Sequence, residues 1–254
     1  MKIGFPTYPR NQMEDEIHWI GNNGFDFADL YFEADKAEAH QIDPKAVRAA
    51  LDKYGLDAVG HTAWYLPIGS PSKPLRDNAV EILKRYVKLC SKIQCDKLTV
   101  HSHWAFGLFT PEEVIGYQTQ SLQALSAFSG DHGVKIIYEA TDTARDSVEN
   151  IRKILELNPE IDFHADLGHL NLHGKDPAAC IVEFKDRLSH VHLHDNNGRA
   201  DLHLPMGAGT IRWDHVIRTL KSCYDGTITL EVFSQDKEYV LLTRKKLLEK
   251  WEAL

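Results

Sequence analysis

Residues 188–209, LSHVHLHDNNGRADLHLPMGAG, read as a strand that runs into a loop rich in metal-ligand side chains. Three imidazoles alternate with aliphatic side chains in the order His190, Val191, His192, Leu193, His194. Because alternate residues of a strand share a face, the histidines point one way and the aliphatics the other. Asp201 and His203 follow, and Gly207-Ala208-Gly209 ends the loop where the backbone can turn tightly or approach a ligand. The pattern predicts a metal site at a strand end; the alternative is a surface loop that happens to be rich in histidine.

Length and composition are typical of one soluble globular domain. The chain has 254 residues, of which 43% are hydrophobic and 26% charged, and single α/β barrels are commonly about 250 residues long. No apolar run is long enough to cross a membrane, and strand-like sequence begins directly after Met1. We therefore expect a cytoplasmic protein with no secretory leader and no membrane partner. The cysteines lack CxxC spacing and are expected to be free thiols: Cys90, Cys95, Cys180 and Cys223.

The charge balance argues against nucleic acid as a general partner. The formal net charge is −8, which gives no global attraction for phosphates, although a local basic patch or bound cations could offset it. The 14 histidines are more informative, because neutral imidazole is the commonest metal ligand in proteins.

Strand-like and helix-like segments alternate along the whole chain. The predicted strands are 2–7, 26–33, 56–61, 96–104, 134–141, 161–169, the opening stretch from 188, and 226–233. The predicted helices are 12–22, 43–55, 75–94, 110–133, 144–157, 177–187, 213–224 and 237–252. The helix at 43–55 has the clearest boundaries, with Asp43 as N-cap, Pro44 in the first turn and Gly55 at the end.

Eight strand–helix units without a linker or a break in composition favour a parallel sheet. At this length they predict an α/β fold, a (β/α)8 TIM barrel forming a single domain over residues 1–254. A doubly wound open sheet is the structural alternative. It fits less well because no glycine-rich dinucleotide fingerprint follows the first strand.

Polar side chains occupy the C-terminal ends of six predicted strands. In chain order they are His61, His101 with His103, Glu139, Asp166 with His169, His192 with His194, and Glu231. In a (β/α)8 barrel all of these ends open on one mouth, where active sites lie. Unpaired charges placed there without a role would carry a desolvation cost.

The two-residue period of the strands supports the same arrangement. Inward-facing pairs are expected at Val59 and His61, Thr99 and His101, Ile137 and Glu139, and Thr229 and Glu231. The intervening residues Val100, Tyr138, Leu230 and Val232 are expected to face the helices. Carboxylates and imidazoles converging from several strands suit Mn²⁺, Mg²⁺, Zn²⁺, Co²⁺ or Fe²⁺. The set is too rich in oxygen for a structural zinc site, which prefers thiolates.

Eight short motifs carry a resemblance to a known family. They are His61 with Tyr65-Leu66-Pro67, Val100-His101, Tyr138-Glu139, Asp166-Leu167-Gly168-His169, His192-Leu193-His194-Asp195, Asp201-Leu202-His203, Gly207-Ala208-Gly209 and Glu231. In this order and spacing the chain resembles the xylose-isomerase-like TIM-barrel superfamily over almost its whole length. That group includes sugar and sugar-phosphate isomerases and epimerases, and AP endonucleases of the endonuclease IV type.

The ketose 3-epimerases of this superfamily imply a single divalent metal held by Glu139, Asp166, His192 and Glu231. The resemblance favours His192 over His194, although both are expected to point inward. It implies that Glu139 and Glu231 are catalytic, moving a proton through an enediolate while the metal polarises the sugar oxygens. His169 is expected to bind substrate, and the implied partner is a small sugar.

The endonuclease IV pattern implies up to three zinc ions on nine residues. All nine have a match here: His61, His101, Glu139, Asp166, His169, His192, Asp201, His203 and Glu231. A phosphodiesterase therefore remains an alternative, with abasic DNA as substrate. It is less favoured, because residues 32–39, FEADKAEA, replace a basic DNA-contacting loop with an acidic one. Tyr65-Leu66 also lies one residue later relative to His61 than the family's DNA-contacting pair.

The remaining polar and aromatic residues receive simpler interpretations. His61 and His101 could bind substrate or be satisfied core histidines, and Asp201 could only shape its turn. Trp64 and Trp104 are expected to line the pocket, which suits a sugar or a nucleotide equally. The other histidines are predicted to be structural: His103, His164, His190 and His215. A non-catalytic barrel protein is the third functional alternative, and homo-oligomerisation stays open.

Overall fold

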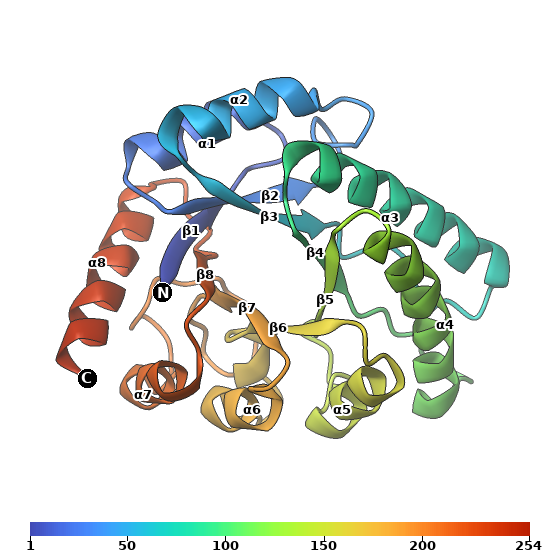
Figure 1. Cartoon of the computed structure of the whole chain (residues 1–254). Helices are drawn as coiled ribbons and strands as arrows, with labels where there is room; N and C mark the ends of the chain where they lie inside the picture. The colour runs from blue at the N-terminus through green and yellow to red at the C-terminus, as the bar shows by residue number, and fades with distance from the viewer.

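Eight parallel strands close into a barrel in the computed structural model, which describes all 254 residues. The strands pair in chain order, and β8 closes the sheet against β1 (Figure 1). Their bounds are β1 Lys2–Pro6, β2 Phe27–Phe32, β3 Asp57–Thr62, β4 Lys97–His101, β5 Lys135–Glu139, β6 Asp162–Asp166, β7 Leu188–Leu193 and β8 Thr227–Leu230. The predicted single-domain (β/α)8 barrel is confirmed.

A ring of helices surrounds the strands (Figure 1). The bounds are α1 Met13–Asn22, α2 Pro44–Tyr54, α3 Lys73–Ile93, α4 Pro111–Gly130, α5 Val148–Leu157, α6 Pro177–Phe184, α7 Trp213–Cys223 and α8 Glu238–Ala253. A short 3₁₀ helix, η1 (His169–Asn171), follows β6. Each predicted helix is present, with ends that shift by a few residues.

Local capping explains where α2 begins and ends. The Asp43 side chain accepts a hydrogen bond from the backbone N–H of Lys45, and Pro44 occupies the first turn. Gly55 ends the helix in the left-handed region at φ 66°. These are the positions that the sequence pattern predicts.

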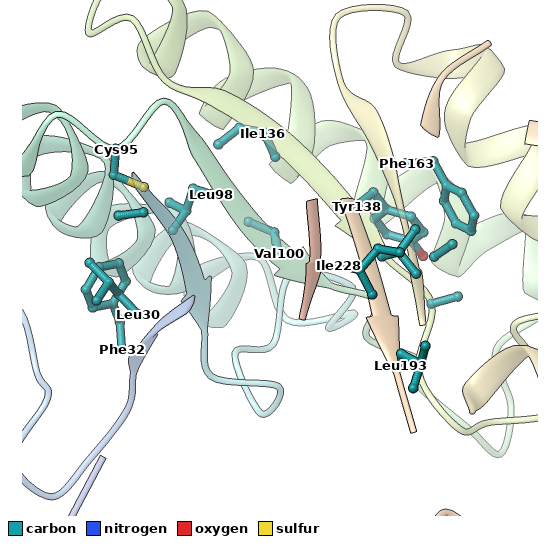
Figure 2. Packing of buried hydrophobic residues seen from close by; sticks show 14 of the residues in the cluster. Leu30, Phe32, Cys95, Leu98, Val100, Ile136, Tyr138, Phe163, Leu193 and Ile228 are labelled. Carbon is teal, nitrogen blue, oxygen red and sulfur yellow. The ribbon is translucent and has the colours of Figure 1, made fainter. Parts of the chain in front are cut away.

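The strands bury one face against the helices and the other inside the barrel. Figure 2 shows outward-facing residues of neighbouring strands packed together, among them Leu98, Val100, Ile136 and Tyr138. A separate inner cluster is made of Phe27, Val59 and Ile137. The predicted inward positions of Val59 and Ile137 and outward positions of Val100, Tyr138 and Leu230 are therefore confirmed.

Four predicted strands, β4, β5, β6 and β8, end two or three residues earlier than the sequence pattern suggests. β4 ends at His101, because the backbone N–H of His103 donates instead to the Gln118 side chain on α4. β6 ends at Asp166, whose carboxylate accepts the backbone N–H of His169 at 2.7 Å and turns the chain into η1. The prediction that polar residues end the strands is thus corrected for four of these residues, which lie just beyond the strands: His103, His169, His194 and Glu231.

The four cysteines are free, as expected, and Cys223 is the one that is only partly buried. None of the helices combines the length and the apolar composition needed to cross a membrane.

The layer between barrel and helices should dominate stability. Phe163 is fully buried on β6, and its ring lies 4.8 Å from that of Phe184 on α6. We expect Phe163→Ala to lower the free energy of unfolding by about 3–5 kcal/mol, because it leaves a cavity. Val182→Ala on the exposed side of α6 is the matched control and should change it by about 0.5 kcal/mol or less. Urea titration measures both; equal effects would contradict this account of the core.

Candidate metal centre and active-site cavity

A cavity of about 1250 Å³ opens at the carboxyl ends of the strands. Its lining includes most of the predicted site residues: His61, Trp64, His101, Trp104, Glu139, His169, Asp201, His203 and Glu231. Asp166 and His192 are fully buried and lie outside this lining. The structure thus brings the predicted set to one end of the barrel, where parallel strands present their last side chains.

Several buried ligand atoms lack a hydrogen-bond partner at this end of the barrel, and four of them form one group. They are Glu139 Oε2, Asp166 Oδ2, His192 Nδ1 and Glu231 Oε2. Buried polar atoms are nearly always paired, so an unpaired group of this kind requires an explanation. Each atom belongs to one of the four residues predicted to bind a single metal.

The spacing of these atoms fits a bound cation. His192 Nδ1 lies 3.2 Å from Glu231 Oε2 and 3.8 Å from Asp166 Oδ2. Ligands about 2.0–2.2 Å from a divalent ion lie about 3.0–3.4 Å apart, so modest inward movement would suffice. Glu139, Asp166 and His192 also form a group whose ligand atoms lie within 4.8 Å of one another. The donor set of three carboxylates and one imidazole suits a catalytic divalent metal.

The electrostatics of the group are strongly coupled. Burial opposes ionisation of Glu231, but His203 and His192 outweigh it and hold the pKa of the carboxyl well below its usual range. Burial likewise opposes the charged form of His192, yet Glu231 and Asp29 raise the pKa of this imidazole well above its ordinary value. In the metal-free protein, the positive charge of protonated His192 therefore offsets part of the negative charge of the carboxylates, which are buried away from water.

His61 and His101 lie beside Glu139 on the cavity side. Their Nε2 atoms are 3.0 Å apart, and they lie 3.8 and 3.3 Å from Glu139 Oε2. Burial, the largest cause, lowers the pKa of His61 to about 3 and that of His101 to about 4. Both are therefore neutral at physiological pH, the form that can bind a metal or a sugar hydroxyl.

A second group of potential ligands lies beside the first. Its members are His169, His194, Asp201 and His203, with ligand atoms within 4.8 Å of one another. His203 Nε2 is 2.8 Å from Asp201 Oδ2, while His194 Nε2 and Asp201 Oδ1 lack a hydrogen-bond partner. His194 therefore lies in the second group, whereas His192 lies in the first.

Two neighbours of the first group were missed in the sequence analysis. Asp29 on β2 is fully buried and its carboxylate lies 2.8 Å from His192 Nε2. Tyr31, two residues later, donates its hydroxyl to Glu231 Oε1 at 2.5 Å. An acidic residue within the otherwise apolar run FADLYF was the available signal, since a fully buried strand is normally apolar throughout.

The histidines predicted to be structural differ in their location: the barrel interior, the cavity wall and the surface of α7. His164 and His190 are fully buried inside the barrel, where His164 contacts Thr99 and His190 contacts Thr227. His103 is half-buried in the cavity wall. His215 is exposed on α7.

The Gly207–Gly209 turn packs against a neighbouring segment of the chain, Asp195 and Asn196. The Gly207 N–H donates to the Asp195 carboxylate at 2.9 Å, and a Cβ on Gly209 would lie 2.1 Å from the Asn196 carbonyl oxygen. Neither glycine lines the cavity. Of the two roles that the sequence leaves open here, the structure therefore shows the tight turn, because the nearby chain already occupies the space and the donor.

Aromatic side chains form part of the cavity wall. Trp64 is 64% exposed, so most of its indole is free for contact. Trp104 is buried, and its indole N–H donates to the buried Asp146 at 2.8 Å. The two residues thus differ: Trp104 is a fixed part of the wall, and Trp64 offers an open surface.

Comparison with known proteins identifies the family. A family model for the xylose isomerase-like TIM barrel matches residues 17–251. The chain belongs to this family.

Several known proteins resemble the chain over nearly its whole length. The uncharacterised protein MJ1311 of Methanocaldococcus jannaschii is 26% identical, with 98% of this chain and 93% of that protein covered. The 3-dehydro-D-guloside 4-epimerase of Escherichia coli is 24% identical, with 91% and 92% covered. The crystal structure of a D-tagatose 3-epimerase-like protein matches at a TM-score of 0.88 and 23% identity over 100% of this chain and 98% of that one, which shows the shared fold.

Metal binding should depend on pH, because a ligand must lose a proton first. The raised pKa of His192 keeps its imidazole protonated at neutral pH without metal. If one proton is displaced per ion, the apparent affinity should fall about tenfold for each pH unit between pH 8 and 6. Competition with a chelating dye at several pH values measures the affinity, and calorimetry in buffers of different ionisation enthalpy counts the protons. An affinity that is the same at pH 6 and 8 would contradict this electrostatic account.

Proposed function

We propose that the protein is a divalent-metal-dependent epimerase or isomerase of an unphosphorylated sugar. The observation that carries this proposal is the group of four unpaired, buried ligand atoms from Glu139, Asp166, His192 and Glu231, of which the two glutamates line the cavity. The similarity to the 3-dehydro-D-guloside 4-epimerase supports a sugar as substrate.

The donor set and its unpaired atoms fit one divalent ion held by these four residues. Mn²⁺, Zn²⁺, Mg²⁺, Co²⁺ and Fe²⁺ all accept such a mixture of oxygen and nitrogen ligands. When bound, the ion would act as a Lewis acid and lower the energy of negative charge on the substrate oxygens.

The two glutamates are suited to move the proton at the carbon that is inverted. Glu139 is the last residue of β5 and Glu231 lies directly after β8, and both line the cavity. One carboxylate would remove the proton from carbon next to the carbonyl, and the other would return a proton to the opposite face of the enediolate. The low pKa of the Glu231 carboxyl in the metal-free protein keeps it ionised, which is the form that a metal ligand needs.

Neighbouring residues would hold the sugar in place. His61 and His101 are neutral and could hydrogen-bond its hydroxyls, and His169 lines the cavity beside Glu139. His169 Nδ1 is 3.0 Å from the Ala140 carbonyl oxygen, which fixes the ring direction. Trp64 and Trp104 provide an apolar surface for the C–H face of the ring.

The charges around the cavity disfavour a phosphate group. Lys237 is the only lysine or arginine in the lining, and its ammonium already lies 2.9 Å from the Glu16 carboxylate. Glu33 and Asp142 add negative charge to the same lining. A phosphate would meet no free cation here, so we infer a neutral sugar substrate.

The same charges make a DNA phosphodiester a poorer substrate than a sugar. All nine residues of the endonuclease IV pattern lie at this end of the barrel, so the metal chemistry alone does not separate the alternatives. Binding of DNA depends on contacts between cations and phosphates, which this mouth does not offer. A second metal on His169, His194, Asp201 and His203 is part of the proposal and would be compatible with either substrate.

Proton exchange tests the proposed reaction. The protein is loaded with Mn²⁺ and incubated in D₂O with a panel of free ketoses, 3-keto glycosides and their phosphates. We expect deuterium at the inverted carbon of an unphosphorylated substrate, detected by NMR. Glu139→Gln and Glu231→Gln should each lower the rate by about 10²–10⁴-fold, because each removes a proton-transfer group.

Glu149→Gln is the matched control, since Glu149 is exposed on α5 and pairs with Lys153 away from the cavity. It should leave the rate unchanged. Cleavage of an abasic-site duplex with no exchange into any sugar would overturn the proposal in favour of the endonuclease.

A further inference from the structure

We propose that β2, which contributes none of the four ligands of the proposed site, sets the orientation of two of them through Asp29 and Tyr31. Asp29 positions His192 on β7, and Tyr31 positions Glu231 just beyond β8. This inference rests on the metal site of the proposed function and assigns to β2 a role in metal affinity.

Asp29 fixes which nitrogen of His192 is free. Its Oδ2 atom accepts hydrogen bonds from His192 Nε2 and from the Thr229 hydroxyl, each at 2.8 Å. An imidazole that donates from Nε2 to a carboxylate leaves its Nδ1 lone pair for a metal, and the carboxylate strengthens the ligand. His192 Nδ1 is the atom that lacks a partner and points at Glu231 and Asp166.

Tyr31 fixes which oxygen of Glu231 is free. Its hydroxyl donates to Oε1 at 2.5 Å, and the other oxygen, Oε2, is the one without a hydrogen-bond partner. The Tyr31 ring is itself held by stacking, with its centroid 4.3 Å from that of His61. His61 in turn stacks on His192 at 5.0 Å, so one column of rings joins the two positioned ligands.

The register of the barrel explains why one strand serves both ligands. His192 pairs with Thr229 between β7 and β8, and Glu231 lies two residues beyond Thr229. Asp29 and Tyr31 are also two residues apart, and both face the interior. Asp29 therefore reaches the layer of His192 and Thr229, while Tyr31 reaches the layer of Glu231.

Simple packing would not account for these two residues. A fully buried carboxylate is costly unless it is hydrogen-bonded, and an apolar residue would fill the same space without that cost. Asp29 Oδ1 has no hydrogen-bond partner, so the carboxylate is not optimised for stability. What it does achieve is a fixed direction for His192.

The metal affinity of the whole 254-residue chain, prepared without metal, tests the proposal. Mn²⁺ and Zn²⁺ are titrated in competition with a chelating dye for the wild type, Asp29→Asn and Tyr31→Phe. We expect each variant to bind about 10–100-fold more weakly, because loss of such a supporting group typically costs this much affinity. With saturating Co²⁺, the visible absorption bands of both variants should also shift, since these bands report ligand geometry.

Two matched controls separate positioning from loss of stability. Asp146→Asn alters another fully buried carboxylate, one that accepts hydrogen bonds from Ser102 and Trp104 and from no member of the first ligand group. Tyr138→Phe removes another buried hydroxyl, which donates to Gln118. Both should keep wild-type affinity and Co²⁺ bands, even where thermal unfolding of the metal-free protein shows a comparable loss of stability.

The outcomes distinguish this inference from the function on which it rests. If the wild type binds metal and Glu139→Gln weakens binding, but Asp29→Asn and Tyr31→Phe bind like the wild type, the role of β2 is refuted alone. If Glu139→Gln has no effect on wild-type metal binding, the metal site itself is refuted and the role of β2 falls with it.

Discussion

Carboxylates buried beside histidines, with no lysine or arginine among them, are the constraint on which the candidate site depends. Glu139, Asp166 and Glu231 are nearly or fully closed to water. Isolated charges in such a place are too costly to persist, so positive charge must be supplied locally. Protons on His169, His192 and His203, whose pKa values are all raised, do this in the metal-free protein, and a divalent cation would do it in the loaded one. Protonated histidine and bound metal thus each supply the positive charge that the buried carboxylates require.

The barrel holds this arrangement through packing that is independent of it. The outward faces of the strands form a continuous apolar layer with the helices, so the inward faces are free to carry polar side chains. Buried aspartates then anchor the loops above: Asp146 accepts the Trp104 indole N–H, and Asp195 accepts that of Trp213, each at 2.8 Å. Loops held in place around rigid strand ends allow a site to bind a ligand in one orientation.

Much of this organisation could be predicted from the sequence, because it follows from periodicity. Alternation of apolar and polar residues placed Glu139 and Val59 correctly on the inward face, and the capping residues placed α2. The contribution of β2 could not be predicted, because Asp29 and Tyr31 act across the barrel on residues about 160 and 200 positions away. The hydrogen bonds of the loops could not be predicted either. The sequence pattern at Gly207 is the same whether its N–H donates to a ligand or, as in this structure, to Asp195.

The most direct test of the account is the position of a bound metal. A crystal of the protein soaked in Mn²⁺ is measured near the manganese absorption edge, and the anomalous difference map is calculated. The account predicts a strong peak among Glu139 Oε2, Asp166 Oδ2, His192 Nδ1 and Glu231 Oε2, whether or not a second peak lies near His194. No peak among these four atoms, at a metal concentration that saturates binding in solution, would contradict it.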